Sequence, residues 1–327
     1  MTQTPTAPAS TRRGPQLPSL TTLGPLIALL LACIFFATQS DRFLTSQTLA
    51  LVLKQISYVG VLAIGQTLVI LTAGIDLSCG VIMALGGMVI TKLAAEQGVP
   101  PALAIIVGLA ITAALGAVNG LLISRLRLPP FIATLGMYGI VFAATQIYSN
   151  AQTVSNLPPA LNFLGSGFNI GNANFSYGSV LMILLFGIAW FFLTQTAPGR
   201  HVYALGNNPE AARLTGILTT RVLIGVYASA GLLYGIAALI LVGRVGAGDP
   251  NAGQTENLES ITAAVLGGTS LFGGRGNVLG TLLGALIVGV FRVGLTLAGV
   301  NSVYQVLVTG ILIILAVATD QLSRRKA

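Results

Sequence analysis

Long apolar runs separated by short polar connections recur along almost the whole chain. A helix needs about 20 mostly apolar residues to cross a lipid bilayer, and such stretches follow one another from Leu20 to Thr319. The pattern predicts an all-α, polytopic bundle of about ten transmembrane helices. The expected spans are 20–38, 51–73, 79–96, 102–124, 131–149, 178–194, 222–243, 260–272, 278–298 and 303–319. The stretch at 260–272 is short, so either it crosses or it re-enters from one side.

Composition supports a membrane protein without a separate soluble domain. Hydrophobic residues make up 54% of the 327 residues and charged residues only 7%, whereas soluble domains are about 25% charged. Residues 1–19 predict a disordered cytoplasmic tail, 20–319 a transmembrane domain, and 320–327 a cytoplasmic C-terminal tail. The run ending at Cys33 loosely resembles a lipoprotein signal, but no soluble domain follows it, so we interpret it as the first span.

The basic residues set the predicted orientation. The net charge of +8 does not indicate nucleic-acid binding, because these residues lie at the ends of spans, as in membrane proteins. An even number of spans with both termini in the cytoplasm leaves Arg42, Lys54, Lys92 and Arg244 outside and Arg292 within a span. The remaining basic residues then all lie inside, as the positive-inside rule expects: Arg12, Arg13, Arg125, Arg127, Arg200, Arg213, Arg221, Arg275, Arg324, Arg325 and Lys326.

Two connections are longer than the others. Residues 150–177 form a charge-free loop that is predicted outside, and residues 195–221 form a loop that is predicted inside. The inner loop contains a short predicted helix, with Asn208 suited to the N-cap, Pro209 to the first position and Gly216 to the C-terminal cap. The spacing alone leaves open whether this helix is a simple connector or a docking element.

Two glycine-rich segments interrupt the apolar runs. The first, GIDLSCG at 74–80, either breaks a helix near a transport pathway or caps the helix that starts near Cys79, and its composition favours the cap. The second, 267–276, lacks the Gly-Lys-Ser/Thr of a nucleotide-binding loop. We interpret it as a tightly packed turn with Arg275 facing the cytoplasm. Breaks in both halves are typical of pseudo-repeated transporters, although these two do not occupy matching positions.

Five polar residues are candidates for a translocation pathway: Gln66, Asp76, Asn119, Gln146 and Arg292. Amides offer donors and acceptors together, which suits a neutral sugar, but single amides also join helices to one another. Arg292 is the most costly of these in lipid, so it is expected to face water or a partner. With one histidine and two separated cysteines, the sequence predicts no catalytic site, metal site or resident cofactor.

Several stretches resemble the permeases of ribose-, xylose- and fructose-type ABC importers of the bacterial inner membrane. They are GQTLVILTAGIDLSCG at 65–80, PPFIATLGM at 129–137, GRHVYALGNNPEAARLTGI at 199–217, ESITAAVLGGTSLFGGRG at 259–276 and GTLLGALIVGVF at 280–291. The resemblance covers about residues 25 to 322, which makes 20–319 a permease domain. The segment 162–177 and the run Ser270-Leu271-Phe272 look closest to fructose-type members.

The resemblance implies a transport subunit that is not itself an enzyme. Two permease copies, expected to be identical, would pair with two cytoplasmic ATPases that bind the ATP, and a periplasmic binding protein would deliver a monosaccharide. The coupling-loop motif that docks to the ATPase is matched at Glu210, Ala211, Ala212, Arg213 and Gly216. Its usual Leu-Pro end is replaced here by Thr219-Thr220-Arg221. An ion-coupled secondary transporter is the alternative, and it would need no ATPase.

Overall fold

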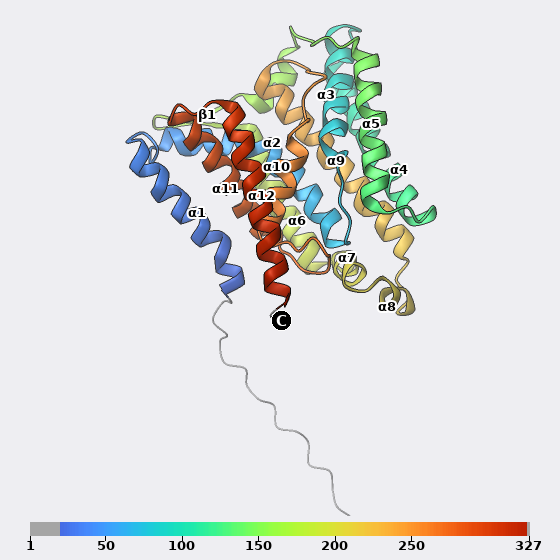
Figure 1. Ribbon diagram of the computed structural model, residues 1–327. Coiled ribbons are helices and arrows are strands. Elements are labelled where there is room, and N and C mark those ends of the chain that lie inside the picture. The colour runs from blue at the N-terminus through green and yellow to red at the C-terminus, as the bar shows by residue number, and fades with distance from the viewer. Residues whose placement is uncertain (1–19, 326–327) are drawn as a thin grey trace, which may run out of the picture.

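The computed structural model describes residues 20–325 and shows a bundle of helices that run between two ends of the molecule (Figure 1). Its elements are α1 (Leu20–Gln39), α2 (Ser46–Leu71), α3 (Cys79–Ala95), α4 (Pro101–Arg125), α5 (Pro130–Ser149), η1 (Pro159–Gly165), β1 (Gly167–Ile170), β2 (Ala173–Ser176), α6 (Tyr177–Gln195), α7 (Ala197–Asn207), α8 (Pro209–Leu214), α9 (Thr219–Val245), α10 (Glu256–Leu266), α11 (Val278–Leu297) and α12 (Ser302–Arg325). The predicted tail 1–19 and residues 326–327 lie outside the described residues. Residues 320–325 continue α12 rather than forming a separate tail.

Every predicted span overlaps a helix, from α1 to α6 and from α9 to α12. Within residues 20–325, six helices are long and apolar enough to cross a membrane, namely α2, α4, α5, α6, α9 and α11. The short stretch predicted at 260–272 overlaps α10 only as far as Leu266, and α10 has 11 residues. At 1.5 Å per residue α10 is about 16 Å long, roughly half of a 30 Å hydrocarbon core. It is therefore a half-length helix that does not cross a bilayer by itself.

The charge-free loop at 150–177 is more ordered than the sequence indicated. It contains the 3-10 helix η1 and a hairpin in which β1 pairs antiparallel with β2, with Gly167 opposite Ser176. Gly171 has a φ of 58°, and such a positive φ is what a two-residue hairpin turn requires. This hairpin is the one departure from the all-α class among the described residues, and it lies at the opposite end of the bundle from α8 (Figure 1).

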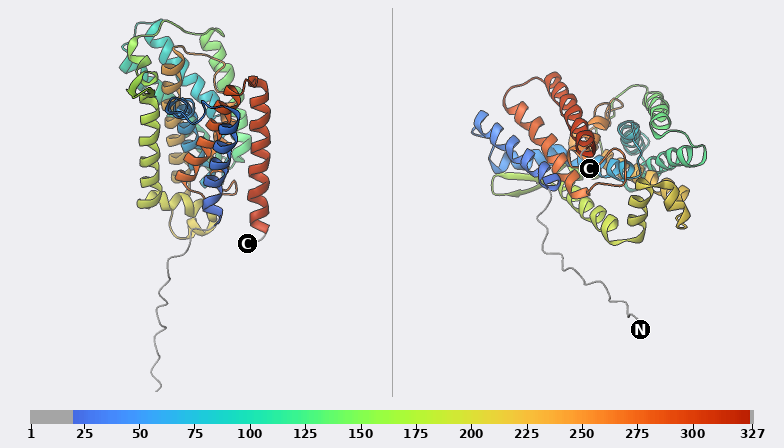
Figure 2. Two further views of the ribbon diagram at one scale, coloured as in Figure 1. Left: turned by 90° about the vertical axis from the view of Figure 1, so that its left-hand side faces the viewer. Right: turned by 60° about the horizontal axis from the view of Figure 1, so that its bottom comes forward.

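Helix α2 forms the centre of the bundle. It packs against α9, α11, α10 and α6, and most of its residues are buried, as expected for a helix that is apolar on all sides. The right-hand view of Figure 2 is turned toward one end of the bundle and shows the other helices around α2. Helices α4 and α9 approach most closely, because Gly116 and Gly231 allow backbone contact: a Cβ on Gly116 would lie 2.1 Å from the Tyr227 carbonyl oxygen. Small residues at such crossings are typical of membrane bundles.

Two helices begin inside the bundle, α3 with 17 residues and the half-length α10, and the start of α3 meets the segment that leads into α10. After α2 ends, residues 72–78 return as non-helical backbone to the start of α3, where Cys79 is fully buried. After α9 ends, residues 246–255 lead to the start of α10 in the same manner. A Cβ on Gly80 would lie 1.9 Å from the carbonyl oxygen of Gly253, so the two segments touch through their backbones. The break that lies against 74–80 is therefore 246–255, a segment that the sequence analysis did not single out.

The segment 267–276 is a tightly packed turn, as predicted. Gly268, Gly273 and Gly274 all have φ values between 68° and 87°, which side chains rarely adopt. The Gly274 amide donates to the carbonyl oxygen of Leu71, 3.0 Å away, so the turn is joined to the end of α2. A Cβ on Gly206 would lie 1.8 Å from the same oxygen. Helix α7, the end of α2 and this turn therefore form one contact region.

The two ends of the bundle differ in charge. The start of α1, the C-terminus, α7 and α8 lie at one end (Figure 1). The helix ends and connections there carry basic residues: Arg125, Arg127, Arg200, Arg213, Arg221 and Arg275. The other end holds the hairpin and the connection between α3 and α4 (Figure 1). We call the arginine-rich end the inner end and the other the outer end.

Candidate functional site

The Asp76 cluster is a buried polar group around the break between α2 and α3, formed by Gln66, Asp76, Ser78, Asn119 and Tyr234. One carboxylate oxygen of Asp76 accepts from the Ser78 amide at 2.8 Å and from the Ser78 hydroxyl at 2.6 Å. The other accepts from the Tyr234 hydroxyl at 3.2 Å. Asn119 Nδ2 donates to Ser78 Oγ at 2.9 Å. All five side chains are fully buried.

Side chains also hold the backbone of the broken segment. Gln66 Nε2 donates to the carbonyl oxygen of Asp76 at 2.6 Å, and Asn257 Nδ2 to that of Leu77 at 3.4 Å. The Thr134 hydroxyl bridges the segment, because it donates to the Ile75 carbonyl oxygen and accepts from the Leu77 amide. Non-helical backbone at membrane depth is tolerated only where such partners replace water.

The preference for a capping role at 74–80 was wrong. Ser78 occupies the N-cap position of α3, but its side chain makes no capping hydrogen bond, and Asp76 is completely buried rather than at an interface. The structure matches the other interpretation, a broken helix within the bundle. It also brings together three of the five predicted pathway residues, Gln66, Asp76 and Asn119, from α2, the broken segment and α4.

A polar cavity of about 350 Å³ lies between α2, α3, α9 and the segment 246–255. This volume falls within the range of about 300–1,000 Å³ that is typical of small-molecule sites. Four charged residues line the cavity, with two positive and two negative side chains, together with Asn251 and Gln254: Arg244, Arg292, Asp249 and Glu256. The rest of the wall includes aliphatic side chains such as Leu241 and Val242. A charge-balanced wall with both donors and acceptors suits a neutral, hydroxyl-rich ligand.

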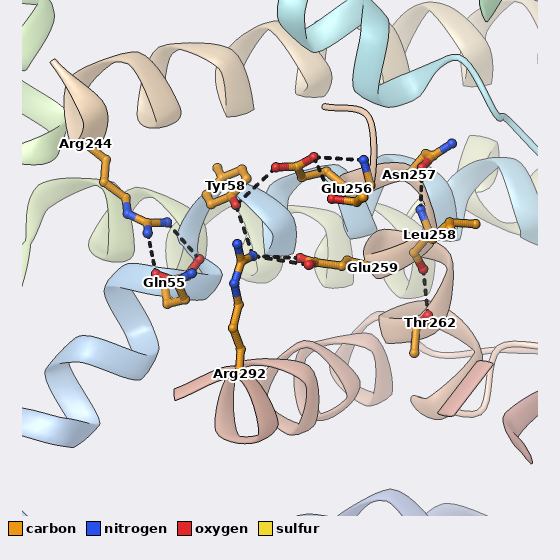
Figure 3. Close-up of polar contacts among 10 residues, drawn as sticks. Gln55, Tyr58, Arg244, Glu256, Asn257, Leu258, Glu259, Thr262 and Arg292 are labelled. Carbon is orange, nitrogen blue, oxygen red and sulfur yellow. Dashed lines mark hydrogen bonds and ion pairs between the residues drawn. The ribbon is translucent and has the colours of Figure 1, made fainter. Parts of the chain in front are cut away.

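Tyr58 connects the charged residues of this wall (Figure 3). Its hydroxyl accepts from Arg292 Nη1 at 3.4 Å and donates to Glu256 Oε1 at 3.5 Å, and the Arg244 guanidinium lies 5.4 Å from the centre of its ring. Arg292 also forms an ion pair with Glu259 at 3.1 Å. Arg292 therefore faces a cavity and a partner, as predicted for an arginine within a span. Arg244 is in turn held by the side chain and backbone of Gln55.

Gln146 lies apart from the other predicted pathway residues. It is near the end of α5, where its Nε2 donates to the carbonyl oxygen of Pro250 at 3.2 Å and to Asn251 Oδ1 at 3.0 Å. It therefore supports the segment 246–255 from outside the cavity.

The predicted coupling residues form a small helix at the inner end. Helix α8 begins at Pro209 and its N-cap Asn208 accepts from the Ala211 amide at 3.0 Å, and Gly216 follows with a φ of 86°, so the predicted cap residues are confirmed. Glu210 and Arg213 form an exposed ion pair with each other at 3.0 Å. The preceding helix α7 joins the 267–276 turn, because the Tyr203 hydroxyl donates to the Gly276 carbonyl oxygen at 3.1 Å. Burial raises the pKa of the Tyr203 hydroxyl, so this hydroxyl keeps its proton and remains a hydrogen-bond donor.

Comparison with known proteins gives a family for this arrangement. Residues 48–317 match the family described as the permease component of the branched-chain amino acid transport system. The chain belongs to this permease family.

Several relatives that align with this chain over most of their length are sugar permeases. The chain is 49% identical to the fructose import permease protein FrcC of Rhizobium meliloti over 93% of this chain and 86% of the relative. It is 41% identical to the ribose import permease protein RbsC of Bacillus subtilis, over 91% and 92% of the two chains. It is 37% identical to the D-allose transport system permease protein AlsC of Escherichia coli, over 90% of each. The resemblance seen in the sequence is thus confirmed, and the chain is a multi-pass protein of the bacterial inner membrane and a transport subunit, not an enzyme.

Several residues of this permease that line or support the cavity were missed in the sequence. Glu256 and Glu259 precede the predicted span 260–272, and Tyr58 and Tyr234 lie within apolar runs, so nothing in the pattern singles them out. One signal was available: an arginine within a span needs a carboxylate partner, and Glu259 stands at the edge of the preceding predicted span.

Proposed function

We propose that this chain is the membrane-spanning permease of an ATP-driven importer that carries a monosaccharide across the bacterial inner membrane. The observation that carries the proposal is the charge-balanced cavity where the start of α3 meets the segment 246–255. A sugar ring presents hydroxyl groups and C–H faces, which match the mixture of charged, amide and aliphatic residues in the wall.

The sugar is fructose, ribose or a related pentose or hexose in this proposal. It is supported by the names of the relatives, which import fructose, ribose and D-allose. Arg292, which lines the cavity, belongs to the pathway. Gln66, Asp76 and Asn119 belong to it as the buried support of the broken segment, and Gln146 as a support of the segment 246–255.

The topology that goes with this function has ten membrane elements and both termini in the cytoplasm. In it α10 pairs with the non-helical segment 246–255, and α3 with 72–78, so that each pair spans the bilayer together. The inner end, with its arginines, faces the cytoplasm, in accord with the positive-inside rule. The domain limits follow from this arrangement: a cytoplasmic tail at 1–19, the permease domain at 20–319 with the coupling loop at 195–221, and a short cytoplasmic C-terminus.

The partners are two cytoplasmic ATPases, a periplasmic sugar-binding protein and a second, identical permease. The permease itself binds no cofactor, since ATP is held by the ATPases. Helix α8 docks to the ATPase through Glu210, Ala211, Ala212, Arg213 and Gly216. Its exposed position at the inner end supports this role, because a docking helix has to be accessible.

Movement of α8 would reach the pathway through packed contacts. Helix α7 directly precedes α8 in the chain and touches both the end of α2 and the 267–276 turn. These two elements flank the broken segment 72–78 and the half-helix α10. An ATPase that moves α8 can therefore shift the junction of α3 with the segment 246–255 between two arrangements, and ATP biases these arrangements differently.

The test is the ATPase activity of the reconstituted assembly. The permease and its ATPase are placed in nanodiscs, and hydrolysis is measured with the binding protein, with and without fructose or ribose. We expect hydrolysis to rise several-fold with sugar-loaded binding protein. Equal hydrolysis with empty and with sugar-loaded binding protein would contradict the proposal.

A further inference from the structure

A second cavity of about 550 Å³ lies on the side of the bundle, away from the polar cavity. It is a groove walled by α2, α6, α7 and α9. Both α6 and α9 pack against α2, which forms the floor between them. The wall is apolar along most of its length, with Leu68, Leu185, Phe192 and Leu233 among its residues, whereas His201 and Arg221 line it near the inner end.

The groove has the length of one leaflet of a bilayer. Arg221 lies in the first turn of α9 and Leu233 twelve residues further on, which corresponds to about 18 Å at 1.5 Å per residue. Half of a hydrocarbon core is about 15 Å. The groove therefore reaches from the inner interface to about the middle of the membrane.

Small residues keep the groove open along α9. Gly225 and Ser229 line it and are exposed, and a Cβ built on Gly225 would meet no atom within 4 Å. These small residues leave the groove open to a slender chain beside α9.

The inner end of the groove carries free positive charge. Arg221 is exposed, and within residues 20–325 neither Arg221 nor His201 has an ion pair or a side-chain hydrogen bond. A basic group at the cytoplasmic interface attracts anionic headgroups, by about 1 kcal/mol for each residue near the surface. The apolar groove and the basic end together have the chemistry of an anionic phospholipid.

We propose that this groove binds one phospholipid of the cytoplasmic leaflet, with an acyl chain along α9 and an anionic headgroup at Arg221 and His201. The site joins α7, which leads to α8, to the central helix α2. A lipid in it would therefore support the contact between the inner-end helices and the bundle. The proposal does not depend on which sugar the protein carries.

The experiment measures lipids that stay with the purified permease. The full chain is incorporated into nanodiscs of equal parts phosphatidylglycerol and phosphatidylcholine with matched acyl chains, released into mild detergent, and examined by native mass spectrometry. We expect one retained lipid, with phosphatidylglycerol favoured about fivefold, the factor that corresponds to 1 kcal/mol. Arg221→Gln should remove that preference, and Gly225→Leu should lower retention of both lipids by filling the groove.

Two matched variants separate this site from the general lipid annulus. Arg200→Gln removes another exposed arginine at the inner end, and Gly187→Leu enlarges an exposed glycine of α6 with open space around it; neither residue lines the groove. Both should behave like the unaltered chain. Equal effects of Arg221→Gln and Arg200→Gln, or of Gly225→Leu and Gly187→Leu, would overturn the proposal. A loss of permease dimers in Gly225→Leu without a change in lipid would also overturn it and make the groove a protein interface.

Discussion

Asp76 is a buried carboxylate whose partners are all uncharged. Three donors reach it, from the amide and hydroxyl of Ser78 and from the hydroxyl of Tyr234. A carboxylate is expensive at membrane depth unless it is fully hydrogen-bonded. Here it fixes the non-helical turn that leads into α3 and joins that turn to α9.

Replacement of Asp76 should therefore destabilise the permease. Asp76→Ala leaves three buried donors without an acceptor, and each costs about 1–3 kcal/mol, so we expect the free energy of unfolding to fall by at least about 3 kcal/mol. Tyr234→Phe removes a single donor and should cost about 1 kcal/mol. Unfolding of the purified protein in detergent measures both. Asp41→Ala, at an exposed carboxylate, is the control, and equal stability of the Asp76 and Asp41 variants would refute this account.

The contributions of Arg292 and Glu259 to stability should depend on each other, because the two side chains form an ion pair. Arg292→Met leaves Glu259, which is 12% exposed, without its cation. We expect the free energy of unfolding to fall by about 2 kcal/mol. This value lies between the roughly 0–1 kcal/mol that an exposed ion pair contributes and the roughly 3–5 kcal/mol that is lost when a fully buried pair is broken. The double variant with Glu259→Gln should recover part of this loss. A double-mutant cycle on unfolding measures the coupling, and strictly additive effects would mean that the pair does not interact.

At the scale of the elements, the contact between the start of α3 and the segment 246–255 matters most. Gly80 and Gly253 meet through their backbones, so neither can move aside easily. Gly80→Ala should cost about 1–3 kcal/mol through overpacking and should lower sugar uptake. Gly136→Ala is the matched control, because this exposed glycine of α5 has no atom within 4 Å of its Cβ position. If Gly80→Ala transports and unfolds like Gly136→Ala, the junction is not a tight contact.

The charged surface of helix α8 should be needed for binding the ATPase but not for folding of the permease. Glu210→Arg breaks an exposed ion pair, which stabilises the protein by only about 0–1 kcal/mol, so the variant should insert and remain folded. It should lose ATPase during co-purification and lose uptake. Exchange of the two charges, Glu210→Arg with Arg213→Glu, restores the pair within α8. Recovery in that double variant would show that only the internal pair matters, and would contradict docking through Glu210.

The sequence predicted the helices better than the site. Apolar runs identify helices because lipid selects for them, and caps such as Asn208 identify α8. The role of Asp76 could not be read in this way, since an Asp before a helix looks the same whether it caps at an interface or lies buried among Tyr234, Ser78 and Asn119. Likewise, the segment 246–255 contains ordinary loop residues, and only three-dimensional packing brings Gly253 against Gly80.

For the whole molecule, the polar cavity and the inner-end helices are two ends of one packed structure. The cavity is bounded by the junction of α3 with the segment 246–255. The end of α2 leads into the broken segment before α3, and the 267–276 turn follows α10. Those two elements contact α7. A change imposed at α8 thus has a continuous route to the cavity, which an ATP-driven importer requires and an ion-coupled carrier does not.

Sugar uptake into vesicles tests the central claim most directly. The permease is reconstituted with its ATPase, and entry of labelled fructose and ribose is measured with the binding protein outside and ATP inside the vesicles. The account predicts uptake only when the ATPase, the binding protein and ATP are all present, and a large loss of uptake in Glu210→Arg. Uptake by the permease alone, driven by an ion gradient, would contradict it.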